Sequence, residues 1–386
     1  MLRKRVTVIW LCIVVVVALF SFTSFAAEKI KIGFFAPLTG FAAADGASAK
    51  QAVEMAVKEI NQRGGISGKE IELVVYDDRA DSKEAVTIAN KLIERDKVIV
   101  AVSGSYSMPT RASAPIFQKA KIPMVTGYSV HPDITRAGNY IFRCSFVGTI
   151  QGAAGAEIAV KKIKAKKIAV LTMDNDFGRT LAKSFAERAK KLGAEIVLEN
   201  VYSLGEKDYT PYLTKVKELN PDLLYTSGYY SEAAMICRQS RDLGLKMQIM
   251  GEEGFDSPMF IDLAGDAAEG VIITTNLNRD DPRPVVQNFI KNYKETYKMD
   301  PDMVGASAYD ALCVAAKAIE VGGTDPKAIR DAIAKTKNFD GVTGIIRGYN
   351  KLGEVMKPVQ VQIVKNGEFR YFAEVTDPEI ITPPSE

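Results

Sequence analysis

The sequence predicts an α/β protein made of two units, each built on a parallel sheet that helices cover. Three observations lead to this class. Short apolar runs alternate along the chain with segments whose apolar residues recur at helical spacing. These runs are continuously apolar, which is typical of parallel strands buried on both faces. The pattern starts again near Ile150, and a length of 386 residues suits about two domains.

The first 26 residues have the layout of a signal peptide, so we exclude them from the fold. Three basic residues at positions 3–5 precede the apolar run Val6–Phe20, and Ser24-Phe25-Ala26 ends in small residues where a signal peptidase cleaves. The run is shorter than the ~20 residues of a membrane span, although an uncleaved anchor stays an alternative. Cleavage leaves 47 basic and 47 acidic residues. Such a neutral chain gives no support to nucleic acid or an anionic membrane as partner.

In the first unit, strand-like and helix-like segments follow each other closely. Expected strands are Ile30–Leu38, Ile71–Asp77, Val98–Val102, Pro123–Tyr128 and Tyr140–Cys144. Expected helices are Ala47–Gln62, the segment around Ala85–Ile93, and Thr110–Lys119. Gly64-Gly65 ends the first helix, since glycine disfavours helix and favours turns.

The second unit repeats this plan, and the last third is mostly helical. Expected strands are Lys167–Thr172, Glu195–Val201, Leu223–Thr226, Gln248–Met250 and Val271–Thr275. Expected helices are Ile150–Lys162, Leu181–Leu192, Pro211–Leu219, Ser231–Leu243, Pro284–Tyr297, Gly305–Val321 and Pro326–Lys335. Asp325-Pro326 is a good helix start, an N-cap followed by proline at the first helical position. Short strands around Thr343–Arg347, Val359–Val364 and Arg370–Glu374 close the chain. The proline-rich end, 377–386, is expected to be loose.

Enzymatic function has little support in the sequence. His131 is the only histidine, and its place before Pro132-Asp133 favours a surface or capping role. Nucleophile-elbow, Walker A and dinucleotide-binding motifs are all absent from the sequence. The three cysteines beyond the leader, Cys144, Cys237 and Cys313, have neither metal-site nor disulfide-framework spacing. We therefore expect no metal and no cofactor, while a catalytic carboxylate pair stays open.

Two groups of residues follow strand ends, where open parallel sheets bind ligands. Ser105 and Ser107 come after the third strand, at the start of a helix whose N-terminus suits a carboxylate or phosphate. In the second unit, Phe177, Tyr229 and Glu253 follow three strands, and aromatics with an acid suit an amine. Each group could also be ordinary turns and surface. Together they predict a zwitterion held between the two units.

The chain resembles the exported substrate-binding proteins of ABC transporters for branched-chain amino acids and related amides. The resemblance spans essentially the whole mature chain. It is carried by IKIGFFAPLTG, EINQRGGISGKEIELVVYDD, the stretch Gly104–Thr135, PDLLYTSGYYSEAAMICRQSRDLGL, AAEGVIITT and FDGVTG. It implies a type I periplasmic binding fold, two lobes joined by a three-strand hinge. Lobe I would comprise 27–146 and 279–352, and lobe II 147–278 and 353–376.

The resemblance also implies roles for individual residues. Ser107 matches a serine that holds the ligand carboxylate; Val130 stands where a second hydroxyl is expected, with Ser129 beside it. The carbonyl of Tyr128 and the carboxylate of Glu253 would hold the ammonium. The remaining positions are aromatic in the family: Tyr229 matches, Phe177 replaces a common tyrosine, and Asp45 replaces an aromatic of the side-chain pocket. Ala80 and Tyr106 occupy the places of a cysteine pair found in some members.

The expected function is that of a periplasmic, monomeric, non-enzymatic solute-binding component of an ABC importer. It would bind a small amino acid or related compound in the cleft and present it to a membrane permease. Asp45 and Val130 depart from the leucine-type pocket, so the sequence leaves the ligand open. A ligand-sensing protein on the same fold is the alternative function.

Overall fold

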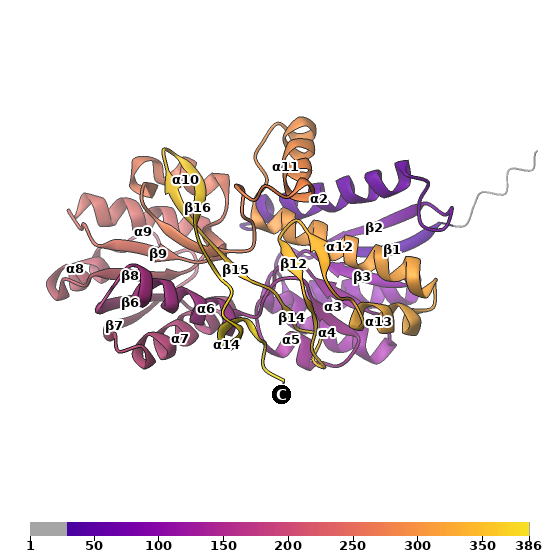
Figure 1. Ribbon diagram of the computed structural model, residues 1–386, viewed down its shortest axis with the longest axis horizontal. Helices are drawn as coiled ribbons and strands as arrows, with labels where there is room; N and C mark the ends of the chain where they lie inside the picture. The colour runs from indigo at the N-terminus through magenta and orange to yellow at the C-terminus, as the bar shows by residue number, and fades with distance from the viewer. Residues whose placement is uncertain (1–28, 386) are drawn as a thin grey trace, which may run out of the picture.

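The computed structural model describes residues 29–385, which form two lobes side by side, each with its own central sheet (Figure 1). The predicted signal peptide, 1–26, lies outside the described residues. In the described part, no helix combines the length and apolar character that crossing a membrane requires. The two-lobed α/β fold predicted from the sequence is therefore confirmed.

The first lobe contains a five-stranded parallel sheet. Across the sheet the order is β2 (Ile71–Asp77), β1 (Ile30–Ala36), β3 (Val100–Ser103), β4 (Met124–Thr126) and β5 (Ile141–Arg143). Helices α2 (Ala43–Gln62) and α12 (Met303–Gly322) cover one face. Helices α3 (Ser82–Asn90), continued by a π-helical segment at Lys91–Arg95, and α4 (Ser107–Ala120) cover the other. The short helix α5 (Asp133–Arg136) precedes β5, while α11 (Pro284–Tyr297) and α13 (Pro326–Ala334) complete the outer layer.

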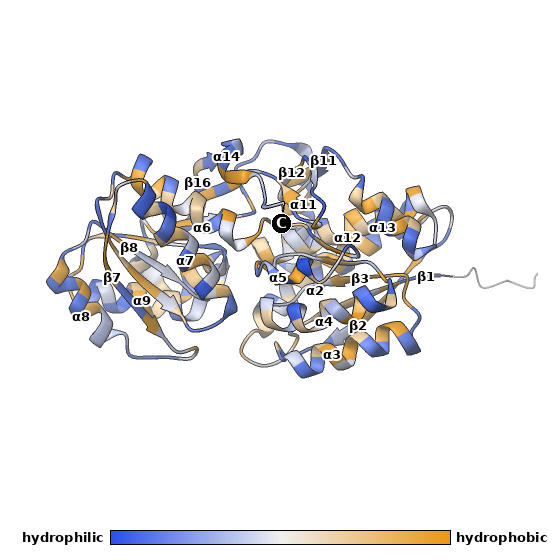
Figure 2. Cartoon of the chain, turned by 90° about the horizontal axis from the view of Figure 1, so that it is seen from below, coloured by the Kyte–Doolittle hydropathy of each residue, from blue (hydrophilic) through white to orange (hydrophobic). Residues whose placement is uncertain are grey.

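Strand β1 shows why the predicted strands are continuously apolar. Phe34 packs in the core beneath α2 and α12, whereas Phe35 packs in the core beneath α3 and α4, where its ring stacks on Phe117. Both phenylalanines are fully buried. In contrast, α3 lies on the surface and alternates apolar and polar residues along its length (Figure 2). A sheet covered on both faces thus needs apolar residues on both sides of each strand.

The second lobe contains a seven-stranded mixed sheet. Across it the order is β16 (Glu368–Val375), β15 (Val359–Lys365), β10 (Ile272–Thr275), β9 (Gln248–Gly251), β8 (Leu223–Ser227), β6 (Lys167–Met173) and β7 (Glu195–Tyr202). Its helices are α6 (Gly148–Glu157) with a π-helical continuation at Ile158–Lys162, α7 (Asp176–Lys191), α8 (Thr210–Leu219), α9 (Tyr230–Asp242) and α10 (Pro258–Ala264). Strand β15 runs antiparallel to β10 and to β16, so this sheet departs from the all-parallel one we predicted.

The chain passes between the lobes three times. It leaves the first sheet after β5 and enters α6, returns after β10 toward α11, and crosses again before β15. Two small hairpins lie along this route: β11 (Phe339–Gly341) with β12 (Gly344–Ile346), and β13 (Gly348–Tyr349) with β14 (Val355–Met356). Three segments of the chain thus connect the two lobes. The predicted residue limits of the lobes stay a prediction.

The expectation of a loose C-terminal tail was wrong. Asp377 caps a short helix, α14 (Pro378–Ile381), by accepting the N–H of Glu379 at 3.0 Å. Ile380 and Ile381 are buried in the core of the second lobe beside α6. Two adjacent isoleucines in a short polar segment were the missed signal, since their burial in the second-lobe core holds this part of the tail in place.

Candidate functional site

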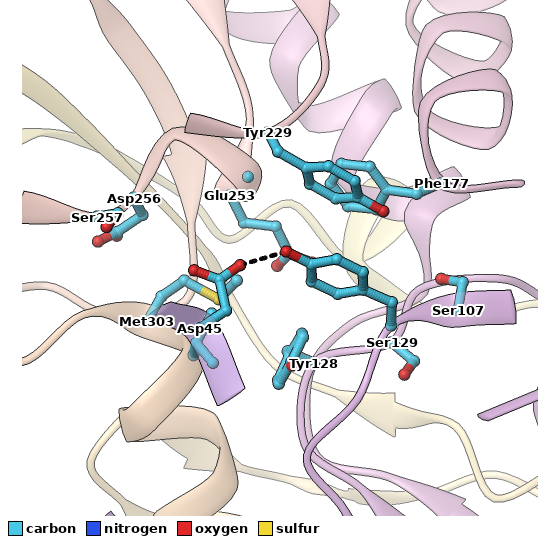
Figure 3. Close-up of a pocket in the computed structure, with 13 residues that line it drawn as sticks. Asp45, Ser107, Tyr128, Ser129, Phe177, Tyr229, Glu253, Asp256, Ser257 and Met303 are labelled. Carbon is cyan, nitrogen blue, oxygen red and sulfur yellow. Dashed lines mark hydrogen bonds between the residues drawn. The ribbon is translucent and has the colours of Figure 1, made fainter. Parts of the chain in front are cut away.

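A small, partly enclosed cavity lies between the two lobes. Its lining residues from the first lobe are Asp45, Tyr106, Ser107, Tyr128, Ser129, Met303 and Val304. Those from the second lobe are Phe177, Tyr229, Glu253, Gly254, Asp256 and Ser257. The free volume is about 20 Å³, room for a single water molecule. The side chains themselves therefore fill most of the space between the lobes (Figure 3).

Ser107 is the first residue of α4, so the helix begins three residues earlier than predicted. Gly104 makes this turn possible, because a Cβ there would lie 2.7 Å from the ring of Phe34. The hydroxyl of Ser107 accepts the N–H of Val130 at 3.2 Å. The hydroxyl of Ser107 and the N-terminus of α4 thus meet at one wall of the cavity, an arrangement that suits an anion.

Glu253 supplies a buried carboxylate on the opposite wall. It follows β9, and its residue is 1% exposed. Its Oε2 accepts the Nδ2–H of Asn276 at 2.9 Å, whereas Oε1 has no hydrogen-bond partner within the described residues. Burial raises the pKa of Glu253 well above its usual value, and the neighbouring Glu252 raises it further. A positive charge in the cavity would satisfy this oxygen.

Glu252, the preceding residue, has a structural role instead. Its two carboxylate oxygens accept the N–H groups of Gly228 at 2.8 Å and Gly254 at 2.7 Å. These bonds tie the loop after β9 to the loop after β8. They hold Glu253 and Tyr229, one in each loop, at the same side of the cavity.

Aromatic rings form a stack that crosses between the lobes. Phe177 and Tyr229 of the second lobe lie 5.3 Å apart between ring centroids, and Tyr106 of the first lobe stacks on Tyr229 at 4.4 Å. Asn175, the N-cap of α7, donates its Nδ2–H to the hydroxyl of Tyr229 at 3.2 Å. Phe41 is 55% exposed and lies beside Tyr106 and Tyr229 at the edge of the stack.

Asp45 lies in the first turn of α2, which begins four residues earlier than predicted. Its residue is 6% exposed, and its Oδ2 accepts the hydroxyl of Tyr106 at 2.6 Å. Burial raises the pKa of Asp45 to about 7, and the nearby carboxylate of Asp302 adds to the shift. Asp302 is itself the N-cap of α12, accepting from Gly305 N at 2.8 Å and Ser48 Oγ at 2.5 Å.

The structure places seven of the nine predicted ligand-binding residues on the cavity lining. Val130 is outside it, because its side chain packs toward Gly148, where a Cβ would lie 3.2 Å from Val130 Cγ2. Ser105 is also outside and fully buried. Ser129 does line the cavity, but its hydroxyl donates to the carbonyl of Ser105 at 2.6 Å. The Ser129 hydroxyl also lies 2.8 Å from Thr110 Oγ1, so both of its hydrogen-bond partners belong to the first lobe.

Sequence reasoning missed Asp256 and the role of Tyr106. Asp256 forms an ion pair with Arg279 at 2.5 Å and accepts the hydroxyl of Thr275 at 2.5 Å. The one sequence feature that could have indicated Asp256 is its place three residues after Glu253 in the same loop. Tyr106 was noted only for occupying a cysteine position, and nothing in its sequence context indicated that its ring would fill the cavity.

An ion pair outside the cavity also joins the lobes. Arg111 of α4 lies 2.9 Å from Asp176 at the start of α7. The lobes are thus in contact through rings and charges. Within residues 29–385, His, Cys, Asp and Glu side chains form no group that could hold a metal ion.

Both the sequence and the fold of the chain are similar to those of known proteins. The periplasmic binding protein profile matches residues 29–368, nearly the whole described chain. The chain belongs to the periplasmic binding protein family. A relative from Pseudomonas aeruginosa, named a leucine-, isoleucine-, valine-, threonine- and alanine-binding protein, is 30% identical over 342 residues, which cover 88% of this chain and 90% of that protein. The Leu/Ile/Val-binding protein of Escherichia coli is 33% identical over 255 residues, 66% of this chain and 69% of that one.

Solved periplasmic binding proteins share the fold. A leucine-binding protein from Thermotoga maritima has a TM-score of 0.85 and 34% identity, covering 91% of this chain and 99% of that one. A branched-chain amino acid substrate-binding protein from Streptococcus pneumoniae, in complex with isoleucine, has a TM-score of 0.84 and 30% identity, covering 90% and 99%. A benzoate complex from Rhodopseudomonas palustris, at 22% identity and a TM-score of 0.82 over 90% of this chain and 96% of that one, shares the fold alone.

Proposed function

We propose that this periplasmic binding protein is the solute-binding component of an ABC importer and binds an amino acid between its lobes. The observation that carries the proposal is Glu253, whose buried Oε1 has no partner within the described residues and which lines the cavity opposite Ser107 and the N-terminus of α4. An α-ammonium would pair with Glu253, and an α-carboxylate would accept from Ser107 and the N–H groups of α4. The names of the relatives support this ligand class.

Closure of the lobes would couple binding to transport. The ligand would bridge the two walls of the cavity, and the hinge would bend to bring Tyr229 and Phe177 over it. The closed form would then dock, as a monomer, on a membrane permease. A chain exported by the predicted signal peptide, 1–26, would act in the periplasm. The sensing alternative gains no support from the relatives described here, and a binding role without turnover accounts for the site.

Replacing Glu253 by glutamine tests the proposal. Removal of one partner of a buried charge pair costs about 2–5 kcal/mol, so binding should weaken on the order of 100-fold. Isothermal titration calorimetry of the chain from Ala27 measures it, first with leucine, isoleucine, valine, threonine and alanine, then with basic, acidic and amide amino acids. Glu218→Gln, an exposed change on α8, is the matched control. Equal affinities of Glu253→Gln and wild type would show that Glu253 does not bind an ammonium group of the ligand.

A further inference from the structure

The cavity lining contains several acidic side chains and no basic one. Among its thirteen residues are three carboxylates, Asp45, Glu253 and Asp256, and no lysine, arginine or histidine. Arg279 neutralises Asp256 from outside the lining. Within residues 29–385, neither Asp45 nor Glu253 lies in an ion pair. A ligand with a single ammonium can pair with only one of these two acidic side chains.

Asp45 receives a hydrogen bond from Tyr106, another residue of the cavity lining. The Tyr106 ring lies in the stack beside Tyr229, and its hydroxyl donates to Asp45 Oδ2. An amino acid is several times larger than the single water that the remaining volume accommodates. A ligand therefore needs more space than this cavity offers, and if Tyr106 moves aside to provide it, Asp45 loses the 2.6 Å bond and needs another donor.

An aliphatic side chain cannot replace that donor. It would cover Asp45 without a hydrogen bond, and burying a polar group without a partner is unfavourable. Asp302, held by Gly305 N and Ser48 Oγ, adds a second negative charge near Asp45. The aromatic rings of Tyr106, Tyr128 and Tyr229 also suit a cation, whose charge is attracted to ring faces. Figure 3 shows Asp45 and Glu253 approaching the same space from opposite sides.

We propose that the ligand is an amino acid with a second positively charged nitrogen on its side chain, and that Asp45 selects it. This inference rests on the proposed function, in which Glu253 takes the α-ammonium. Asp45 would then hold the side-chain nitrogen in place of the Tyr106 hydroxyl. The pocket is accordingly built for a basic amino acid and disfavours leucine, isoleucine and valine.

Pairs of amino acids with equal size and different charge test the inference. Ornithine and norleucine have side chains of equal length, as do 2,4-diaminobutyrate and norvaline, and lysine and arginine extend the series. Calorimetry on the wild-type protein should show at least one cationic member binding about tenfold or more tighter than its neutral counterpart. Asp45→Asn, which keeps the shape of the side chain, should abolish that preference.

Two further variants complete the experiment. Asp45→Leu should lose the cationic ligand and gain norleucine or leucine, while Asp262→Asn, an exposed change on α10, should behave as wild type. Circular dichroism confirms that each variant is folded. Tighter binding of a neutral member by the wild type, or an unchanged preference in Asp45→Asn, would overturn this inference and leave the proposed function standing. Failure of every amino acid to bind the wild type would instead overturn the proposed function.

Discussion

At the scale of the residue, buried charges are concentrated where the lobes meet. Arg143 is fully buried at the end of β5; its Nε donates to Glu354 Oε2 at 2.8 Å, and its Nη2 donates to the carbonyl of His131 at 2.8 Å. Glu354 lies between β13 and β14, beside the crossing into the second lobe. This buried ion pair therefore links two of the three segments that connect the lobes. Arginine suits this place because its guanidinium can donate to several acceptors at once.

Removing the arginine should be costly. Arg143→Met leaves the Glu354 carboxylate buried without its partner, and breaking a buried pair in this way costs about 3–5 kcal/mol. Urea unfolding should show a correspondingly lower free energy of unfolding. The double variant Arg143→Met/Glu354→Leu should recover much of the loss, since no unpaired charge remains. If the double variant were as unstable as the single one, packing and not charge would explain the effect.

At the scale of the element, helix ends follow local rules that the sequence displays. Asp325 caps α13 as predicted: its Oδ2 accepts the N–H of Ala328 at 2.8 Å, and Pro326 occupies the first helical turn. Helices α2 and α4 were less predictable, because neither has a side-chain cap. Their first turns instead form tertiary hydrogen bonds, that of Asp45 with Tyr106 and that of Ser107 with Val130. These are also the turns that bring Asp45 and Ser107 to the cavity.

The cap of α13 can be tested apart from the site. Asp325→Ala should lower the free energy of unfolding by about 1 kcal/mol, because one N–H at the helix start loses its acceptor. Asp325→Asn keeps an acceptor and should lose much less. Thermal unfolding measures both variants. Asp325 is not among the cavity residues, so calorimetric affinity should stay unchanged; a change in affinity would contradict the assignment of α13 to a purely structural role.

At the scale of the whole molecule, folding buries several acidic side chains at and near the cavity. Burial raises the pKa of Asp45 to about 7, of Asp302 to about 6 and of Glu252 to about 8. In the unfolded chain these groups titrate near pH 4. Between pH 4 and pH 8 the folded protein therefore binds more protons than the unfolded one. Its stability is greatest at the acidic end of this window and falls as pH rises through these pKa values.

The ligand-free protein should accordingly unfold at a higher temperature at pH 5 than at pH 8. Each unit of difference between folded and unfolded pKa corresponds to about 1.4 kcal/mol. Differential scanning calorimetry across this range measures the slope. Asp45→Asn removes one titrating group and should flatten the curve between pH 4 and pH 7. A midpoint that rises with pH over this range would show that the acids are not buried in the ligand-free protein.

The sequence by itself determined most of the elements and their order along the chain. Apolar runs such as Ile71–Asp77, helical periodicity and caps such as Asp325-Pro326 depend on neighbours along the chain, so they can be recognised locally. It also indicated Ser107 and Glu253, because polar residues after parallel strands converge at one edge of a sheet.

Only the tertiary structure decided what fills the space between the lobes. Tyr106 and Asp45 are 61 positions apart, and their hydrogen bond exists because α2 and the turn before α4 converge. The pairing of Asp256 with Arg279, the departure of Val130 from the cavity and the burial of Ile381 likewise depend on contacts between distant segments. Local patterns place a residue at the end of a strand or helix, whereas packing between elements determines which neighbours its side chain contacts.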